Sequence, residues 1–460
     1  MTRHAWLLVL PLLLAGVAGG GAQPPQAAGL DHFKYGSVGI EPEEGVPYWI
    51  WQVLPRVFAD LLPGGYASLG FVWEPGHELP IGFSKREVLG STRVAINCAF
   101  CHTATYRLSA GAPRQVVPGG ASSLVAPQRF SRFLETAAAD PRFSASTLMP
   151  AIAQVGTLSW FESAAYRLLL IPGTRRALLR HRDEFRWMDR RPDWGPGRID
   201  SINPFKFRQL RQPVDETIGT ADMTPLWSLH LRDGRALHWD GLNPSLSEAL
   251  VGSALGNGAS VKSVDVESVN RVGGWLRDLR PPAWPLPVDA GLAARGRTVF
   301  DAACASCHAP SGPRMGTVIP LDEVGTDAHR LDSWTAAAAG AFNGLAAGRP
   351  WQMRSYRKTD GYVAMPLDGV WLNAPYLHNG SVPTLEALLA DPADRPTRFY
   401  RGYDVLDTDG VGFIAAGAGA ERDGVLLDTS RPGNGNQGHV YGTGLAGDAR
   451  RALLEYLKTL

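Results

Sequence analysis

The sequence predicts a mainly α-helical protein in which two similar units follow one another, with long loops and a helical insertion in the first unit. Two motifs of the form Cys-x-x-Cys-His, far apart in the 460 residues, are the first observation behind this prediction. Segments with apolar residues at helical spacing near the ends of both units are the second. The third is a proline-rich segment, 281–287, which we predict to link a first unit, 23–280, to a second unit, 288–460.

The two motifs use all four cysteines of the chain and are Cys98-Ala-Phe-Cys101-His102 and Cys304-Ala-Ser-Cys307-His308. This spacing is typical of covalent haem attachment, because two thiols add to the two vinyl groups of one haem and the adjacent histidine becomes an iron ligand. A disulfide framework, a redox-active cysteine pair or one zinc held by the four cysteines is the alternative. None of these needs a histidine after each pair, so we predict two covalently attached haem c groups in two tandem cytochrome c domains.

Three helices are predicted around these motifs. Apolar residues at helical spacing predict a helix over 291–303, just before Cys304, and a second over 448–460, with Asp448 as its capping residue. In cytochrome c domains these two helices cross. A third helix, over 264–279, is predicted to end the first domain.

Residues 126–200 form the predicted insertion, which contains helix-like stretches at 128–139 and 160–171 and which we expect to cover the first haem. Its basic and aromatic run at 181–191 is interpreted as a solvated face. The net charge of +1 argues against nucleic acid as a partner.

Residues 1–22 resemble a secretory signal peptide, with Arg3 and His4, then an apolar run, then small residues. We therefore expect export to the periplasm or secretion, which agrees with haem attachment outside the bacterial cytoplasm. An uncleaved membrane anchor is the alternative. No other long uncharged apolar stretch follows, so the mature chain is not expected to be an integral membrane protein.

The function depends on the sixth ligand of each iron, because a histidine or methionine there makes an electron carrier, whereas an open position admits dioxygen or peroxide. For the second haem we predict His439, which lies in a glycine-rich loop at 433–443. Met365 is its rival. For the first haem we predict an open position, with His77 as the alternative ligand.

Two further segments resemble a known superfamily. The stretch 374–385, which contains His378, and the segment His238-Trp239-Asp240-Gly241 are similar to stretches of the bacterial dihaem cytochrome c peroxidases and their relatives. The loop of His439 and the length of the chain are closer to the dihaem rubber oxygenases. The resemblance implies that Trp239 is an electron bridge between the haems, that the second haem has two histidine ligands, and that the first binds dioxygen. It also implies a structural role for His378.

Two details depart from that superfamily or extend it. The catalytic glutamate of the peroxidases has no clear counterpart, since Glu248 is too close to Trp239, and a peroxidase needs such a group to move a proton. The superfamily often binds calcium between its haems, and the segment 404–410 offers oxygens for calcium. Because it lacks the glutamate of an EF-hand, no calcium site is assigned.

The sequence therefore favours a periplasmic redox enzyme, a peroxidase-like or oxygenase-like haem oxidoreductase, in which the second haem passes electrons through Trp239 to a reactive first haem. Its expected partners are a redox protein or small-molecule reductant, and dioxygen or peroxide. The alternatives are a dihaem electron carrier with both irons six-coordinate, and a haem-bearing subunit of a larger complex. The organic substrate cannot be read from the sequence.

Overall fold

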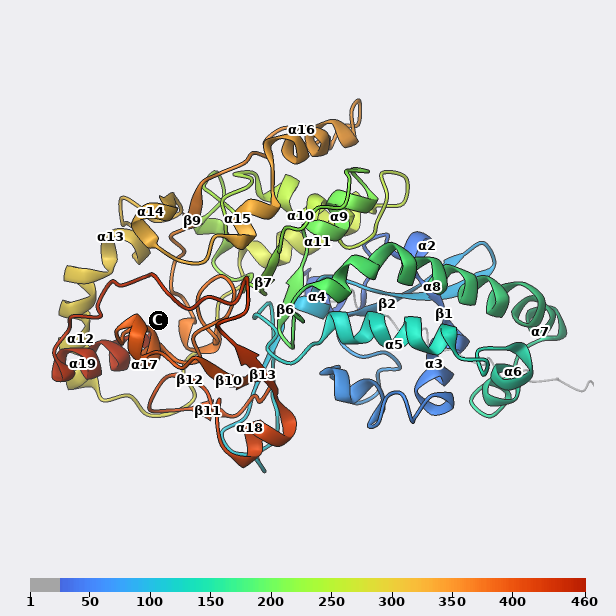
Figure 1. Ribbon diagram of the computed structural model, residues 1–460, viewed down its shortest axis with the longest axis horizontal. Helices are drawn as coiled ribbons and strands as arrows, with labels where there is room; N and C mark the ends of the chain where they lie inside the picture. The colour runs from blue at the N-terminus through green and yellow to red at the C-terminus, as the bar shows by residue number, and fades with distance from the viewer. Residues whose placement is uncertain (1–24) are drawn as a thin grey trace, which may run out of the picture.

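The computed structural model describes residues 25–460 and is largely helical (Figure 1). Helix accounts for 42% of the chain and strand for 12%, and the described residues form no closed sheet. The mainly helical prediction is confirmed at this level. The predicted signal peptide, 1–22, lies outside the described residues.

The longer helices lie in two groups, before and after the proline-rich segment. They are α1 (Pro25–Tyr35), α3 (Tyr48–Val57), α5 (Pro127–Ala139), α6 (Ala145–Ala153), α7 (Trp160–Ala165), α8 (Ile171–Phe185), α9 (Asn203–Arg208), α10 (Leu246–Gly256), α11 (Val266–Arg277), α12 (Ala290–Ala303), α16 (Ala336–Leu345), α18 (Ala418–Asp423) and α19 (Gly447–Leu457). Shorter helical turns are α2 (Glu41–Glu44), α4 (Cys98–Cys101), α13 (Ala305–His308), α14 (Leu321–Val324), α15 (His329–Ser333) and α17 (Leu385–Leu388).

The strands are short and all their pairings are antiparallel. One sheet has three strands in the order β1 (Val46–Pro47), β3 (Ser91–Ile96), β2 (Phe83–Val88), with Val46 opposite Val94 and Phe83 opposite Ile96. The others are pairs: β4 (Thr103–Tyr106) with β5 (Gln115–Pro118), β6 (Arg198–Asp200) with β7 (Thr220–Asp222), β8 (Val318–Pro320) with β9 (Gly361–Val363), β10 (Arg398–Arg401) with β13 (Val425–Asp428), and β11 (Leu406–Asp407) with β12 (Gly412–Phe413).

Helices α12 and α19 cross, as expected for the helices predicted over 291–303 and 448–460. The crossing is close at Gly296, where an added Cβ would lie 1.9 Å from the carbonyl oxygen of Ala452. The predicted capping role of Asp448 is wrong. Helix α19 begins at Gly447, after Ala446, and no side chain caps it. Asp448 lies in its first turn, where its carboxylate interacts favourably with the helix dipole.

The helix predicted over 264–279 is α11, and it begins where Asp265 accepts a hydrogen bond from the N–H of Ser268 at 3.0 Å. Its buried side chains include Val269, Val272 and Leu276, and α1 packs beside it. The proline-rich segment 281–287 follows without regular structure.

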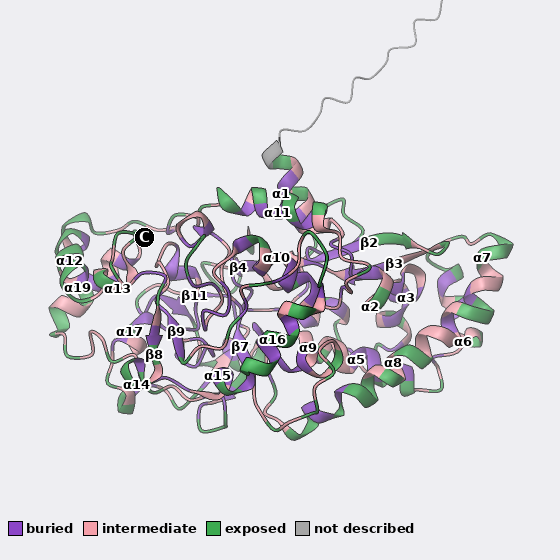
Figure 2. Ribbon diagram, turned by 90° about the horizontal axis from the view of Figure 1, so that it is seen from above, coloured by how far each residue is buried: buried purple, intermediate pink, exposed green. Residues whose placement is uncertain are grey.

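The predicted insertion contains α5, α6, α7 and α8, in agreement with the helix-like stretches at 128–139 and 160–171. A wide π-helical turn, Tyr166–Leu170, joins α7 to α8. In two perpendicular views these helices form one end of an elongated molecule, and α12 and α19 form the other (Figures 1 and 2).

The two halves of the chain share hydrophobic cores. Ala104 and Trp227, before the proline-rich segment, pack in one cluster with Trp371 after it. Ile40 packs in another cluster with Phe342. The division into two domains at 281–287 stays a prediction, and the structure adds that the two halves are packed together. None of the helices in the described part of the chain is long and apolar enough to cross a membrane.

Candidate functional site

The first motif lies on the short helix α4, which Asn97 fixes in place. The Asn97 side chain accepts a hydrogen bond from the N–H of Ala99 at 3.0 Å and donates to the carbonyls of Lys34 and Gly36. An asparagine before a helix commonly caps it in this way. Here it also ties the cysteine pair to the end of α1.

The histidines of the two motifs are held in the same way. The Nδ1 atom of His102 lies 2.7 Å from the carbonyl oxygen of Thr224, and that of His308 lies 2.7 Å from the carbonyl oxygen of Met365. A carbonyl only accepts, so Nδ1 carries the proton in both rings and Nε2 keeps the lone pair that a metal needs. Burial lowers the pKa of His102 to about 4 and also lowers that of His308, so both rings are neutral at pH 7.

His439 faces His308. Their ring centres lie 6.2 Å apart, and the rings are inclined by 47°. With metal–nitrogen bonds of about 2 Å and a further ~1 Å from each nitrogen to its ring centre, one metal between two imidazoles needs about 6 Å. The pair of rings therefore fits one iron between them.

The backbone around His439 explains why the loop is rich in glycine. His439 has a φ of 45°, and its N–H donates to the carbonyl of Val324 at 2.7 Å. An added Cβ on Gly438 would lie 2.3 Å from the carbonyl carbon of Gly325, so a side chain does not fit there. Burial, and next the His308 ring, lower the pKa of His439 to about 4, which keeps it in the neutral, metal-binding form.

Met365 contributes its carbonyl oxygen to the His308 ring, on the side of that ring away from a metal at Nε2. The carbonyl of Met365 therefore lies on the Nδ1 side of His308. The ring of His439, 6.2 Å from that of His308, is the candidate second ligand.

A cavity of about 240 Å³ adjoins the first motif. Its walls include Cys98, Cys101 and His102 from the motif, and Trp334 and Phe342 from the second half of the chain. Most of the lining is apolar, as a haem plane requires. No ring comparable to His439 lies against the His102 ring among residues 25–460, so the first site differs from the second.

Two arginines in this cavity suit the carboxylates of a haem. The side chains of Arg232 and Arg330 are buried and line the cavity, and each Nε atom has no hydrogen-bond partner among the described residues. Arg330 pairs with Asp240 at 3.3 Å, and Arg232 donates to the carbonyls of Ala236 and His238. A buried donor without a partner is costly, and guanidinium groups bind carboxylates in a bidentate fashion. The residues present therefore fit haem at this site. These two arginines could not be predicted from the sequence, because an isolated arginine is usually exposed.

His238 and Trp239 also line the cavity. His238 has a φ of 63°, and its Nε2 atom is buried without a partner among the described residues. Burial lowers its pKa to about 4. The sequence analysis named His238 only as part of the segment 238–241, which resembles the superfamily.

Trp239 lies between the two motifs. Its indole lines the cavity of His102 and also packs in a small apolar cluster with Cys307 of the second motif. The indole N–H donates to the carbonyl of Asp222 at 2.8 Å, which fixes the orientation of the ring. Trp239 thus borders the surroundings of both motifs.

The carboxyl groups near the cavity have different roles. Glu248 accepts hydrogen bonds from Asn243 and from the backbone of Ser355, so it stabilises a loop and does not line the cavity. Asp222 is the one carboxyl group among the described lining residues, and it accepts a hydrogen bond from Arg401 at 2.5 Å. Burial raises the pKa of Asp222 to about 6 despite the two neighbouring arginines, Arg401 and Arg198. The sequence analysis missed this group.

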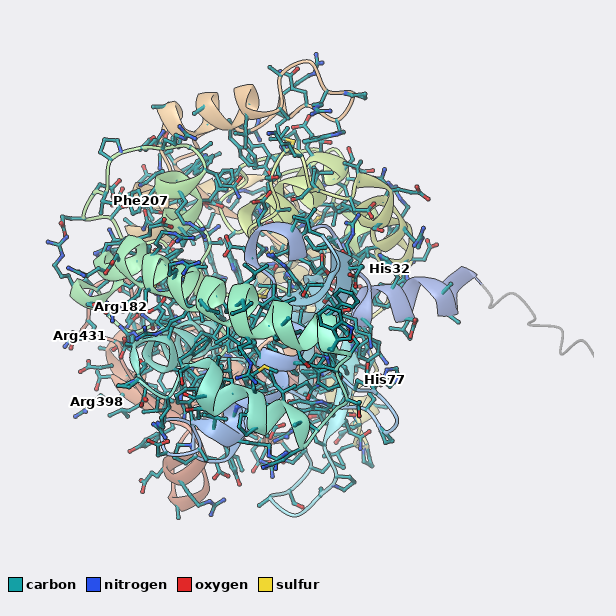
Figure 3. The ribbon with its side chains drawn as sticks, turned by 90° about the vertical axis from the view of Figure 1, so that its right-hand side faces the viewer. His32, His77, Arg182, Phe207, Arg398 and Arg431 are labelled. Carbon is teal, nitrogen blue, oxygen red and sulfur yellow. The ribbon has the colours of Figure 1, made fainter. Side chains whose placement is uncertain are left out.

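The other predicted residues lie elsewhere. His77 is exposed and stacks on Tyr35, with ring centres 4.1 Å apart, and it does not line the cavity. In the view onto the inserted helices, His77 and His32 lie at one side and Arg182 at the other (Figure 3). The buried His378 lies 3.0 Å from the hydroxyl of Tyr362 through Nε2, which agrees with a structural role.

In the segment considered for calcium, 404–410, the Asp404 carboxylate binds two arginines. The Asp404 carboxylate, fully buried, pairs with Arg107 at 2.7 Å and with Arg114 at 2.5 Å. No cluster of three or more histidine, cysteine, aspartate or glutamate residues suited to a metal ion occurs within the described residues.

A second cavity, of about 230 Å³, adjoins the first, and the two share wall residues that include Ile40, Phe205 and Asn257. Several aromatic side chains line it, among them Phe100 of the first motif. His181 of the insertion also lines it, and its Nδ1 lies 2.8 Å from the carboxylate of Glu135. The insertion therefore borders an apolar space beside the first motif.

Comparison with known proteins gives a family match and two relatives. Residues 361–400 match a family described as RoxA-like, cytochrome c-like, and this segment contains the carbonyl that holds His308. A cytochrome c-like segment implies haem c. The chain is 32% identical over 319 residues to the uncharacterized protein y4iM of Sinorhizobium fredii, covering 58% of this chain and 71% of y4iM. It is 26% identical over 360 residues to the uncharacterized protein y4iJ of the same organism, covering 58% of this chain and 60% of y4iJ.

Proposed function

We propose that this chain, which belongs to the same family as y4iM of Sinorhizobium fredii, is a dihaem c-type cytochrome that acts as a redox enzyme. In this proposal His102 holds a reactive haem, and His308 with His439 holds an electron-transfer haem. When bound, the two groups supply one iron that takes up dioxygen or peroxide and one that delivers electrons.

The observation that carries the proposal is the difference between the two histidine environments. His308 has a partner ring at 6.2 Å, whereas His102 faces a cavity. Two protein ligands leave no position for a substrate, and one ligand leaves a position open. The exposed position of His77 argues against His77 as a sixth ligand of the first iron.

The residues around the cavity have distinct roles in this account. His102 presents Nε2 because Thr224 holds Nδ1. Trp239 provides the contact between the two sites. The Asp222 carboxyl, with its pKa near 6, can hold a proton at the cavity wall and release it close to neutral pH.

The adjoining aromatic cavity is where we propose that an organic substrate binds. A dry apolar cavity of about 150 Å³ is already enough for benzene, so this space suits a somewhat larger apolar molecule. The predicted signal peptide supports export to the periplasm, with a redox protein or small-molecule reductant as electron donor.

Carbon monoxide binding to the reduced holoprotein tests the proposal, because carbon monoxide occupies only open ferrous positions. We expect one carbon monoxide per chain. In the matched variant His439→Ala we expect two, since the second iron loses its protein ligand. Binding of none by the unaltered protein would support the electron carrier and contradict the proposal.

A further inference from the structure

The inserted helices expose a row of large apolar side chains at one end of the molecule. Trp160, Phe161, Leu168 and Leu169 are 70%, 67%, 70% and 68% exposed, and Val155 lies just before them. We name these five residues the apolar tip. In both ribbon views α7 lies at the end of the molecule farthest from α12 and α19 (Figures 1 and 2).

The backbone that carries the apolar tip is part of a capped helix that packs on the core. Ser159 and Glu162 form a capping box that starts α7, and the Trp160 and Phe161 rings stack with centres 3.5 Å apart. On the opposite face of the same segment, Tyr166 and Ile171 are buried in the core. The buried residues anchor this segment, so the exposed side chains of the apolar tip belong to a well-packed part of the fold.

The charges around the apolar tip are basic. Arg167, Arg176 and Arg180 are exposed on the same continuous helical segment, and none forms an ion pair with a carboxylate of the described residues. The nearest acidic group in sequence, Glu162, is bound to Ser159 by its side chain. Glu87, on the neighbouring hairpin, is the other carboxylate that acts on Tyr166. The apolar surface therefore has more positive than negative charge beside it.

We propose that the apolar tip docks on the surface of a bilayer that contains anionic phospholipid. Interfacial helices characteristically place tryptophan, phenylalanine and leucine at the boundary of the acyl chains and arginine at the head groups. Each basic residue near such a surface adds a favourable interaction with anionic lipid.

A second copy of the chain fits the apolar tip less well. In a symmetric contact between two tips, Arg167 of one copy would approach Arg167 of the other, which is unfavourable for like charges. An exposed apolar surface of this size also rarely remains without a partner. Charge complementarity therefore favours the lipid surface.

Docking through α7 would direct the second motif away from the lipid. Helices α12 and α13, which carry Cys304 to His308, lie toward the opposite end of the long axis (Figure 1). A redox partner could then reach the second haem while the insertion faces the bilayer. This inference does not depend on what reacts at the first haem.

Vesicle flotation of the exported holoprotein, purified without detergent, tests the proposal. The probes are vesicles of phosphatidylcholine alone and of phosphatidylcholine mixed with phosphatidylglycerol. We expect binding to the mixed vesicles that weakens about tenfold on pure phosphatidylcholine and in about 0.5 M salt.

The variant in which Trp160, Phe161, Leu168 and Leu169 are replaced by serine should lose binding at least about tenfold. Its matched control replaces four exposed apolar residues elsewhere by serine, namely Leu108, Val214, Ile414 and Leu426. The control should bind as the unaltered protein does, and both variants should keep their haem spectra.

Equal flotation of the tip variant and the unaltered protein, or no binding by the unaltered protein, would overturn the proposal. So would a dimer in sedimentation velocity that dissociates in the tip variant, because the occupant of the apolar tip would then be a second copy.

Discussion

The centres of the His308 and His439 rings lie 6.2 Å apart, although the two residues are 131 positions apart in the sequence. The carbonyl of Met365 holds the His308 ring at Nδ1. The backbone of His439 is held by the hydrogen bond from its N–H to the carbonyl of Val324. A haem iron between them would have two protein ligands.

We predict that His439→Met keeps the second haem six-coordinate and raises its reduction potential. A thioether ligand stabilises the reduced iron relative to imidazole, and the expected rise is on the order of 100 mV within the roughly 0.8 V that axial ligands span. Spectroelectrochemical titration measures it. Met365→Leu is the control and should leave the potential nearly unchanged, because Met365 contributes its carbonyl oxygen. A large change of the potential in Met365→Leu would mean that Met365, and not His439, is the iron ligand.

Trp239→Phe should slow electron transfer between the two haems by about tenfold or more while leaving both haem spectra unchanged. The reason is that Trp239 lines the cavity of the first motif and packs against the same apolar cluster as Cys307 of the second. Phenylalanine keeps this packing but loses the indole and its hydrogen bond to Asp222. Flash photolysis of the half-reduced protein measures the rate. An unchanged rate would mean that electrons follow another path.

Asp404→Asn should lower the free energy of unfolding by about 2–4 kcal/mol at pH 7, because two arginines would lose their charged partner. Burial alone would raise the pKa of Asp404, but Arg114, Thr105 and Arg107 outweigh it and hold the pKa below its usual value. A lowered pKa stabilises the fold above the unfolded value, near 4, and this stabilisation is lost as the pH falls through the folded value.

The difference between Asp404→Asn and the unaltered protein should therefore be complete at pH 7 and shrink below about pH 4. Denaturant titrations at several pH values measure it. The exposed Asp409→Asn is the control and should cost less than about 0.5 kcal/mol. A difference between Asp404→Asn and the unaltered protein that grows as the pH falls would contradict the ion-pair account.

Gly296→Ala should destabilise the protein by about 1–3 kcal/mol, because the added Cβ would press on the Ala452 carbonyl where α12 and α19 cross. Gly291→Ala, in the same helix, serves as the control. Its added Cβ would lie 3.4 Å from the Asp289 side chain, which is an ordinary contact. Thermal unfolding of both variants measures the difference. Equal stability of the two would contradict the close crossing.

Local patterns predicted much of this architecture. The helical periodicity before Cys304 gave α12 within one residue of its start, and α11 lies inside the predicted 264–279. The start of α19 was misplaced because an aspartate suits both a capping position and a first turn. The sequence could not show that the halves share cores, since no local pattern records which distant side chains meet.

Candidate site residues could be proposed from the sequence where adjacent residues form a recognisable motif. The two motifs are of this kind, and the glycine-rich loop pointed to His439. Asp222, Arg232 and Arg330 were missed because their importance comes from burial and from the cavity they share, which depend on the folded chain. His77 was considered because it is close to Cys98 in sequence, yet the fold leaves it exposed.

Low-temperature electron paramagnetic resonance of the oxidised holoprotein tests most directly whether the two irons have different coordination. We predict one low-spin ferric signal from the haem between His308 and His439, and one high-spin signal that becomes low-spin on addition of cyanide. Two low-spin signals that do not respond to cyanide would contradict a reactive first haem.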